Sequence, residues 1–186
     1  MRALLLRHGE SVHNANRSGE PKAHSEGDKL TEKGVEQARA AGAGLRELGV
    51  TRLLSSPLRR ARETAQAVGD ALGLDAEEID YTGELTSGES FEQAIERVRQ
   101  LKAELEAGED GELPLLVTHG IFTRFFLLDS VLGERFEASM AAGIWNLGSH
   151  NCGLSVFAHG ESLDPLGQVI PGWTCLTWME RPWNRP

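Results

Sequence analysis

The stretch Ala3-Leu4-Leu5-Leu6-Arg7-His8-Gly9 joins a short apolar run to an abrupt polar end. Four successive apolar residues are typical of a strand that is buried on both faces of a sheet. His8 then follows the strand at its carboxyl end, where open α/β sheets bind their ligands, and Gly9 permits a sharp reversal and leaves room for a ligand. The stretch predicts a buried strand of an α/β fold with a histidine at its carboxyl end.

The same design returns in the second half of the chain. Leu113 to Val117 is another apolar run of strand length, and Thr118-His119-Gly120 follows it. A single His-Gly pair at a strand end is more often a turn than a site. Two such pairs can face one crevice, because the carboxyl ends of strands in an open α/β sheet border the ligand site. We therefore expect His8 and His119 to lie close together.

Apolar residues recur at spacings of three and four in the segments between these strands, which predicts amphipathic helices. We expect helices from the N-cap Thr31 to Gly49, from the N-cap Ser56 with Pro57 as first helical residue to Gly73, from the capping box Ser90-Gln93 to Gly108, and from Gly120 to Gly133. Leu53-Leu54 predicts a further strand, and the alternation over Cys152 to Ala158 predicts one near the sheet edge. The alternation of strands and helices, without a linker, predicts one α/β layer sandwich and a single domain over residues 1–186.

The charge of the chain excludes several classes of partner. There are 19 Lys and Arg against 28 Asp and Glu, a net charge of -9, which disfavours general binding to nucleic acid or to an anionic membrane. The apolar runs are too short to span a bilayer, and Arg7 and His8 end the first one too early for a signal peptide. We expect a cytoplasmic protein whose cysteines, Cys152 and Cys175, are thiols without a metal.

Basic residues follow the second predicted strand, in Ser56-Pro57-Leu58-Arg59-Arg60. Arginine in the first turn of a helix opposes the helix dipole and costs about 0.3 to 1 kcal/mol, unless an anion binds at the same place. Arg59 is explained by a solvated helix face, whereas Arg60 is explained less well in that way. Because the guanidinium group matches phosphate oxygens with two parallel hydrogen bonds, Arg60 is a candidate phosphate ligand.

Arg7, His8, Arg60 and His119 together supply two guanidinium groups and two imidazoles. A neutral imidazole can attack phosphorus in line, while the neighbouring cations offset charge on the equatorial oxygens. We therefore expect His8 to carry the phosphoryl group and to pass it to water. No metal ion and no cofactor are expected, because protein cations already neutralise the phosphate.

The stretch Arg7-His8-Gly9-Glu10-Ser11-Val12-His13-Asn14 resembles the signature of the histidine phosphatase superfamily, the phosphoglycerate mutase-like enzymes. The resemblance continues over Leu30-Thr31-Glu32-Lys33-Gly34, Gln37-Ala38, Ser55-Ser56-Pro57-Leu58-Arg59-Arg60-Ala61, Glu63-Thr64-Ala65 and Val117-Thr118-His119-Gly120. It implies His8 as nucleophile, Arg7, Arg60 and His119 as the phosphate pocket, and Asn14 as a further phosphate contact. It also implies a three-layer α/β/α sandwich with a mostly parallel central sheet.

The chain departs from that family where members usually carry their proton donor. The aromatic-Glu-Gly stretch that normally follows this glutamate is missing. Glu84 is our first candidate for the general acid and Glu89 the second, although Glu89 also suits the helix start at Ser90. Either glutamate would need a raised pKa. The missing stretch predicts a small cap, with substrate access shaped by Asn16 to Asp28 and Ala138 to Asn151.

These features favour a phosphomonoester hydrolase whose partner is a small phosphorylated metabolite or a phosphoprotein. A phosphoglycerate mutase, a phosphohistidine protein phosphatase and a non-catalytic phospho-ligand binding module are the alternatives. The absence of extended basic inserts disfavours the mutase, and the paired histidines disfavour a module that only binds. The sequence leaves the natural substrate and the oligomeric state open.

Overall fold

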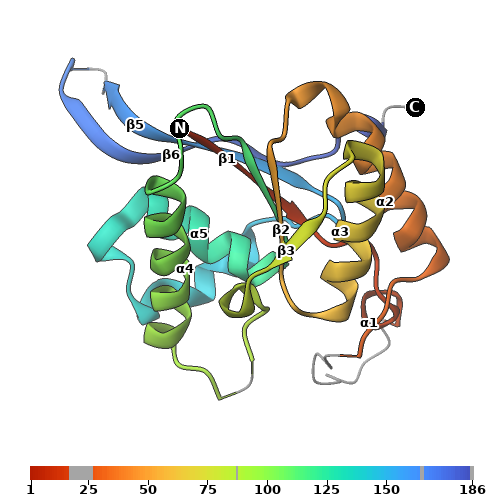
Figure 1. The fold of residues 1–186 in the computed structure, drawn as a ribbon. Coiled ribbons are helices and arrows are strands. Elements are labelled where there is room, and N and C mark those ends of the chain that lie inside the picture. Colours follow the sequence, from red (N-terminus) through yellow and green to blue (C-terminus); the bar gives the residue numbers. More distant parts are fainter. Residues whose placement is uncertain (17–26, 87, 164–165, 185–186) are drawn as a thin grey trace.

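The central feature of the fold is one mixed sheet of six strands in the order β3-β2-β4-β1-β5-β6 (Figure 1). The computed structural model describes residues 1–16, 27–86, 88–163 and 166–184. The strands are β1 (Arg2–Arg7), β2 (Arg52–Ser55), β3 (Ala76–Glu78), β4 (Pro114–Thr118), β5 (Leu154–Leu163) and β6 (Val169–Glu180). The first four pair in parallel and the last two are antiparallel, which confirms the mostly parallel sheet.

Helices cover both faces of this sheet. They are α1 (Val12–Ala15), α2 (Glu32–Leu45), α3 (Arg59–Leu72), α4 (Phe91–Glu106) and α5 (Gly120–Leu132). In Figure 1, α2 and α3 lie on one side of the sheet and α4 and α5 on the other. The three-layer α/β/α sandwich is thereby confirmed.

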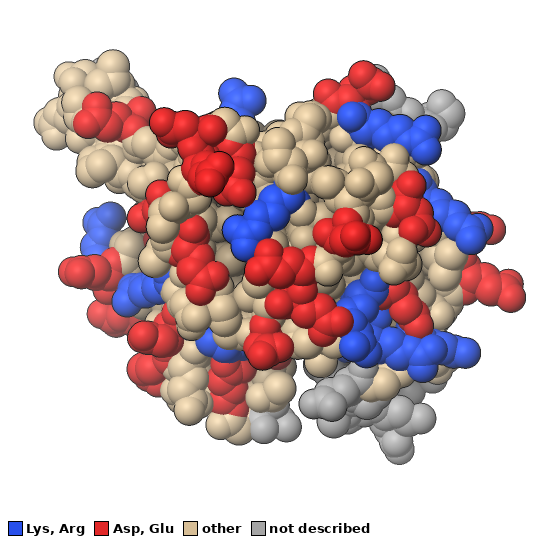
Figure 2. Space-filling model, in the orientation of Figure 1, with Lys and Arg blue, Asp and Glu red and all other residues tan. Residues whose placement is uncertain are grey.

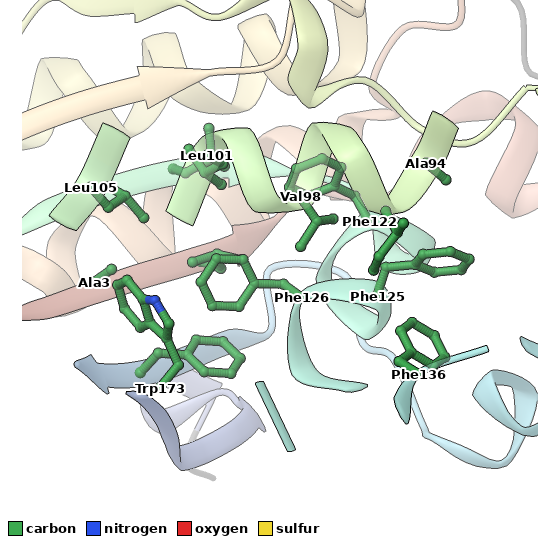
Figure 3. Packing of buried hydrophobic residues seen from close by; sticks show 14 of the residues in the cluster. Ala3, Ala94, Val98, Leu101, Leu105, Phe122, Phe125, Phe126, Phe136 and Trp173 are labelled. Atoms are coloured by element: carbon green, nitrogen blue, oxygen red, sulfur yellow. The ribbon is translucent and has the colours of Figure 1, made fainter. Parts of the chain in front are cut away.

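Two hydrophobic clusters fill the spaces between the layers, because alternate residues of a strand point to opposite faces. Leu5 of β1 belongs to the cluster beneath α4 and α5, and Leu4 and Leu6 belong to the cluster beneath α2 and α3. Figure 3 shows Val98 and Leu101 of α4 close to the phenylalanines of α5 in the first cluster. The apolar runs of the central strands are continuous because each residue has an apolar layer to enter.

The predicted start of α3 is wrong. The helix begins at Arg59 with Leu58 at the N-cap, so that Ser56 and Pro57 precede it. Ser56 does not cap the helix because its hydroxyl lies 2.7 Å from His119 Nε2, although it also accepts a bond of 3.3 Å from the Leu58 N–H. The predicted N-caps Thr31 and Ser90 are confirmed, and Ser90 forms a capping box with Gln93.

The C-terminal part holds more strand than the sequence predicts. The strand predicted over Cys152 to Ala158 is β5, which pairs with β1 and lies one place from the sheet edge. β6 forms that edge and was not predicted, and neither was β3 at the opposite edge. In Figure 1 the far end of the β5–β6 hairpin projects beyond the helical layers. In the described part of the chain, no helix has the length and apolar content that crossing a bilayer requires.

Candidate active site

The parallel pairing of β1 with β4 brings the two histidines together. Arg7 and Thr118 are opposite each other in this ladder, and the His8 N–H continues it by donating to the Thr118 carbonyl at 2.9 Å. His8 follows Arg7 and His119 follows Thr118, so both histidines lie at the carboxyl-end edge of the sheet. The imidazole centroids of His8 and His119 are 5.1 Å apart, and both side chains are buried.

Hydrogen bonds define the tautomer of His8. Its Nδ1 lies 2.7 Å from the Gly9 carbonyl oxygen, which can only accept a hydrogen bond. Nδ1 therefore carries the proton, and Nε2 keeps a lone pair that accepts a bond of 3.2 Å from Arg60 Nε. The nitrogen with nucleophilic character is the one that points to the guanidinium.

Arg60 is only 1% exposed, and its position explains why a basic residue starts α3. Its Nη1 lies 3.9 Å from Asp28 Oδ2, and neither Nη1 nor Nη2 has a hydrogen-bond acceptor among the described residues. Burial lowers the pKa of this guanidinium, an effect that the charges of Glu84 and Asp28 oppose. A buried cation whose donors lack acceptors is costly, and an anion bound beside it removes that cost. Arg59, by contrast, is exposed and pairs with Glu63 at 2.7 Å, as the solvated face predicts.

Ser56 is a site residue that the sequence analysis missed. This fully buried side chain contacts His119 Nε2 at 2.7 Å and so helps to fix the orientation of the imidazole ring. The Ser56 N–H donates to the Val117 carbonyl, which fixes the turn between β2 and α3. Ser-Pro before a helix is the usual signal for an N-cap, and nothing in the sequence indicates a second role.

Gly9 is required for a reason other than the one predicted. A Cβ at this position would lie 2.5 Å from the carbonyl oxygen of Gly34, so the space beside Gly9 is occupied by α2 and not reserved for a ligand. The Gly9 N–H donates to Thr64 Oγ1 at 3.0 Å, and that hydroxyl donates to the Arg60 carbonyl at 2.7 Å. Gly9 therefore ties the His8 turn to α2 and α3.

Arg7 and Asn14 lie beside the histidines, on the side of α1. Arg7 Nη1 donates to the Ser149 carbonyl at 2.8 Å. Asn14 Oδ1 accepts a bond of 3.0 Å from Asn151 Nδ2, which also donates to the His8 carbonyl at 3.1 Å. Both residues line a hollow of about 400 Å³, together with Lys33, His150 and Arg181 among others. Residues 149–151 of the Ala138 to Asn151 region thus lie beside Arg7 and Asn14, whereas most of Asn16 to Asp28 lies outside the described residues. That these two regions shape substrate access stays a prediction.

The two candidate general acids differ in their surroundings. Glu84 is buried and accepts hydrogen bonds from the Ile121 and Phe122 N–H groups, at 3.2 and 3.3 Å, at the start of α5. Glu89 forms an ion pair with Arg97, whose Nη2 donates to Glu89 Oε2 at 2.8 Å. Both glutamates line a cavity of about 1070 Å³ between the start of α3 and the start of α4. Glu84 is the one whose charge acts on Arg60.

The described residues offer no ready metal site, because no three His, Cys, Asp or Glu side chains among them converge as ligands. The guanidinium group of Arg60 brings positive charge to His8, with Nε at 3.2 Å from the imidazole Nε2.

Comparisons with known proteins agree with this fold. The chain is 32% identical over 211 residues to a protein of Erwinia tasmaniensis described as a probable phosphoglycerate mutase, GpmB, with 95% of this chain and 92% of that protein covered. The fold is similar to that of a phosphoserine phosphatase from Entamoeba histolytica, with a TM-score of 0.77, 18% identity and 99% of each chain covered. A mycobacterial glucosyl-3-phosphoglycerate phosphatase gives a TM-score of 0.74 and 21% identity, with 97% of this chain and 99% of that one covered.

The model of the histidine phosphatase superfamily (branch 1) matches residues 3–85 and 77–164, which include both histidines, Arg7, Arg60 and Glu84. This chain belongs to the histidine phosphatase superfamily.

Proposed function

We propose that this chain hydrolyses phosphomonoesters through a phosphohistidine formed on His8. The observation that carries the proposal is the contact between His8 Nε2 and the buried Arg60 guanidinium, at 3.2 Å. It combines a nitrogen lone pair with a cation whose Nη donors lack acceptors among the described residues. A phosphoryl group placed there meets a nucleophile and its charge partner at once.

In the first step, His8 Nε2 attacks phosphorus and the ester P–O bond breaks as the N–P bond forms. Arg7, Arg60 and His119 offset the charge on the equatorial oxygens, and the Asn14 amide is a further contact. Glu84 donates a proton to the leaving oxygen, which departs as an alcohol. Glu84 accepts hydrogen bonds from backbone N–H groups at the start of α5, directly after His119. Glu89 is instead paired with Arg97.

In the second step, water attacks the phosphohistidine and Glu84 takes up the proton that the water loses. The N–P bond breaks, inorganic phosphate leaves and His8 returns to its neutral form. The reaction needs no metal ion, because Arg7 and Arg60 supply the positive charge that a metal otherwise provides.

Phosphoryl transfer of the phosphoglycerate mutase type is the second candidate, and the name of the Erwinia relative favours it. It differs only in the acceptor of the second step, which is the bound substrate and not water. A phosphohistidine protein phosphatase would use the same first step on a protein surface. A module that only binds phospho-ligands has no need for a histidine held as the Nδ1–H tautomer.

The test is hydrolysis of p-nitrophenyl phosphate by wild type and His8→Ala, in EDTA. Wild type is expected to be active, and His8→Ala to lose at least about a thousandfold in kcat, as nucleophile removal does elsewhere. His159→Ala is the matched control, since His159 lies on β5 outside the site and pairs with Glu106. Full activity in His8→Ala would remove the mechanism.

Two further measurements separate the candidates. Rapid quenching after mixing with labelled substrate should trap a label that is lost in acid and survives in alkali, as a phosphoramidate is. Incubation with phosphoglycerate then distinguishes release of inorganic phosphate from transfer between hydroxyl groups. A label with the opposite stability would identify a nucleophile other than histidine.

A further inference from the structure

The cavity of about 1070 Å³ beside the site has an unusual charge. The described residues that line it include five carboxylates, those of Asp80, Glu84, Glu89, Glu92 and Glu96, and one cation, that of Arg97. Figure 2 shows acidic side chains gathered over much of the face that carries α4. Arg97 is already paired with Glu89, so the carboxylates of the other residues are left to set the potential inside the cavity.

This cavity adjoins the phosphoryl site. Glu84 lines it and acts on Arg60 through its charge, and Leu58, which caps the helix that begins with Arg59 and Arg60, lines it as well. The buried Arg60 Nη donors, without acceptors among the described residues, supply the anion position of the proposed phosphoryl site. In the proposed mechanism Glu84 protonates the leaving oxygen. Because Glu84 also lines the cavity, the rest of the leaving group would extend into it.

Glu92 and Glu96 form the α4 side of this cavity and are exposed. The pKa of Glu92 is lowered by its own backbone N–H and by the Ser90 hydroxyl, so its carboxylate is ionised at neutral pH. Neither Glu92 nor Glu96 has an ion-pair partner among the described residues. A helix-start role accounts for Glu92, but it does not account for Glu96 one turn later.

We propose that the substrates of this site are phosphorylated amino alcohols, whose protonated amine enters the carboxylate-lined cavity while Arg60 holds the phosphoryl group. This inference rests on the proposed function and names its substrate class. The leaving group of phosphoglycerate carries a carboxylate, which would meet like charges in the same cavity. This repulsion lowers the affinity of the site for phosphoglycerate. The inference therefore separates the chain from a phosphoglycerate mutase by its specificity.

The test compares kcat/KM for phosphoethanolamine, ethyl phosphate and phosphoglycolate, three small esters that differ in the charge at the far end. We expect phosphoethanolamine to exceed phosphoglycolate by at least about tenfold, with ethyl phosphate between them, and the ratio to shrink at high salt because the charges are solvent-accessible. Glu92→Gln/Glu96→Gln should reduce the ratio by about fivefold or more, since it removes two of the attracting charges. Glu36→Gln/Glu47→Gln, an equal charge change at exposed positions outside the cavity, should leave the ratio as it is in wild type.

The outcomes distinguish the two proposals. If ethyl phosphate is hydrolysed but phosphoglycolate is preferred, or if the ratio is the same in the cavity variant and the control, the amino-alcohol specificity is wrong and the phosphatase stands. If none of the three esters is hydrolysed at any concentration, the proposed function fails and this inference fails with it.

Discussion

The two His-Gly turns look alike in sequence, but they hold their histidines in different ways. His8 binds its own neighbour through Nδ1 and presents Nε2 to Arg60. His119 is held through Nε2 by Ser56 and is followed directly by α5. The comparison teaches that one turn presents a ring nitrogen to a buried guanidinium, whereas the other holds its ring through a buried hydroxyl. The predictions below test this difference, first by comparing the two turns directly and then through residues that contact one of them.

The largest expected effect separates the two histidines. His8→Asn should abolish the phosphoenzyme, because the attacking nitrogen is gone. His119→Asn should still form it, with kcat lower by about a hundredfold, as loss of one charge-stabilising donor costs elsewhere. Quench-flow labelling of both variants measures this, and a stable phosphoenzyme in His8→Asn would reverse the assignment of the two turns.

The second prediction concerns the glycines. Gly9→Ala places a Cβ 2.5 Å from the Gly34 backbone oxygen, and α2 must move to admit it. We expect a loss of about 3 kcal/mol in the free energy of unfolding, in the range of overpacked cores. Gly120→Ala meets the Ser149 hydroxyl at 2.9 Å, together with guanidinium atoms of flexible side chains. It should cost about 1 kcal/mol or less. Urea unfolding of both variants gives the comparison, and equal losses would contradict it.

The third prediction tests Ser56 as a positioning residue. Ser56→Ala removes the group that holds His119 Nε2, so kcat should fall about tenfold, a typical cost for a lost buried hydrogen bond. KM should change little, because Ser56 acts on the orientation of His119 and does not itself contact the substrate. Ser56→Thr should restore most of the activity. Ser55→Ala is the matched control, since Ser55 is equally buried but donates to the Ser56 carbonyl.

The smallest expected effect concerns Cys152, whose N–H donates to the Arg7 and His8 carbonyls beneath the first turn. Burial raises the pKa of this thiol to about 12, so it stays protonated at mildly alkaline pH. Iodoacetamide should therefore leave Cys152 unmodified in the folded protein and alkylate it after unfolding. Peptide mass spectrometry of both samples reads this out, and rapid labelling of the folded chain would show that the first turn opens.

Sequence reasoning found the histidine pair because both signals are local. The His-Gly pair after each apolar run shows where the strand ends. Parallel pairing of β1 with β4 then brings the two ends together. Arg60 was found because its charge contradicts the helix dipole. Each inference depends on residues that are adjacent in the sequence.

The features that the sequence did not predict depend largely on residues far away in the chain. The sequence around Ser56 indicates an N-cap, but its hydroxyl contacts His119, which follows the distant strand β4. The need for a glycine at position 9 arises from the close packing of α2, which the local sequence does not show. β3 consists of three exposed residues at a sheet edge, so it carries no apolar pattern. β6 contains Pro171 and Gly172, which argue against a strand but are tolerated on an edge.

The buried guanidinium of Arg60 has a consequence for handling the protein. If Arg60 binds phosphate as proposed, other tetrahedral oxyanions, including sulfate and the released product, are expected to bind the same donors. Buffers that contain such ions should therefore raise the melting temperature and slow turnover together, by competing for one location. Thermal scans and rate assays of this chain are comparable only when their anion composition matches.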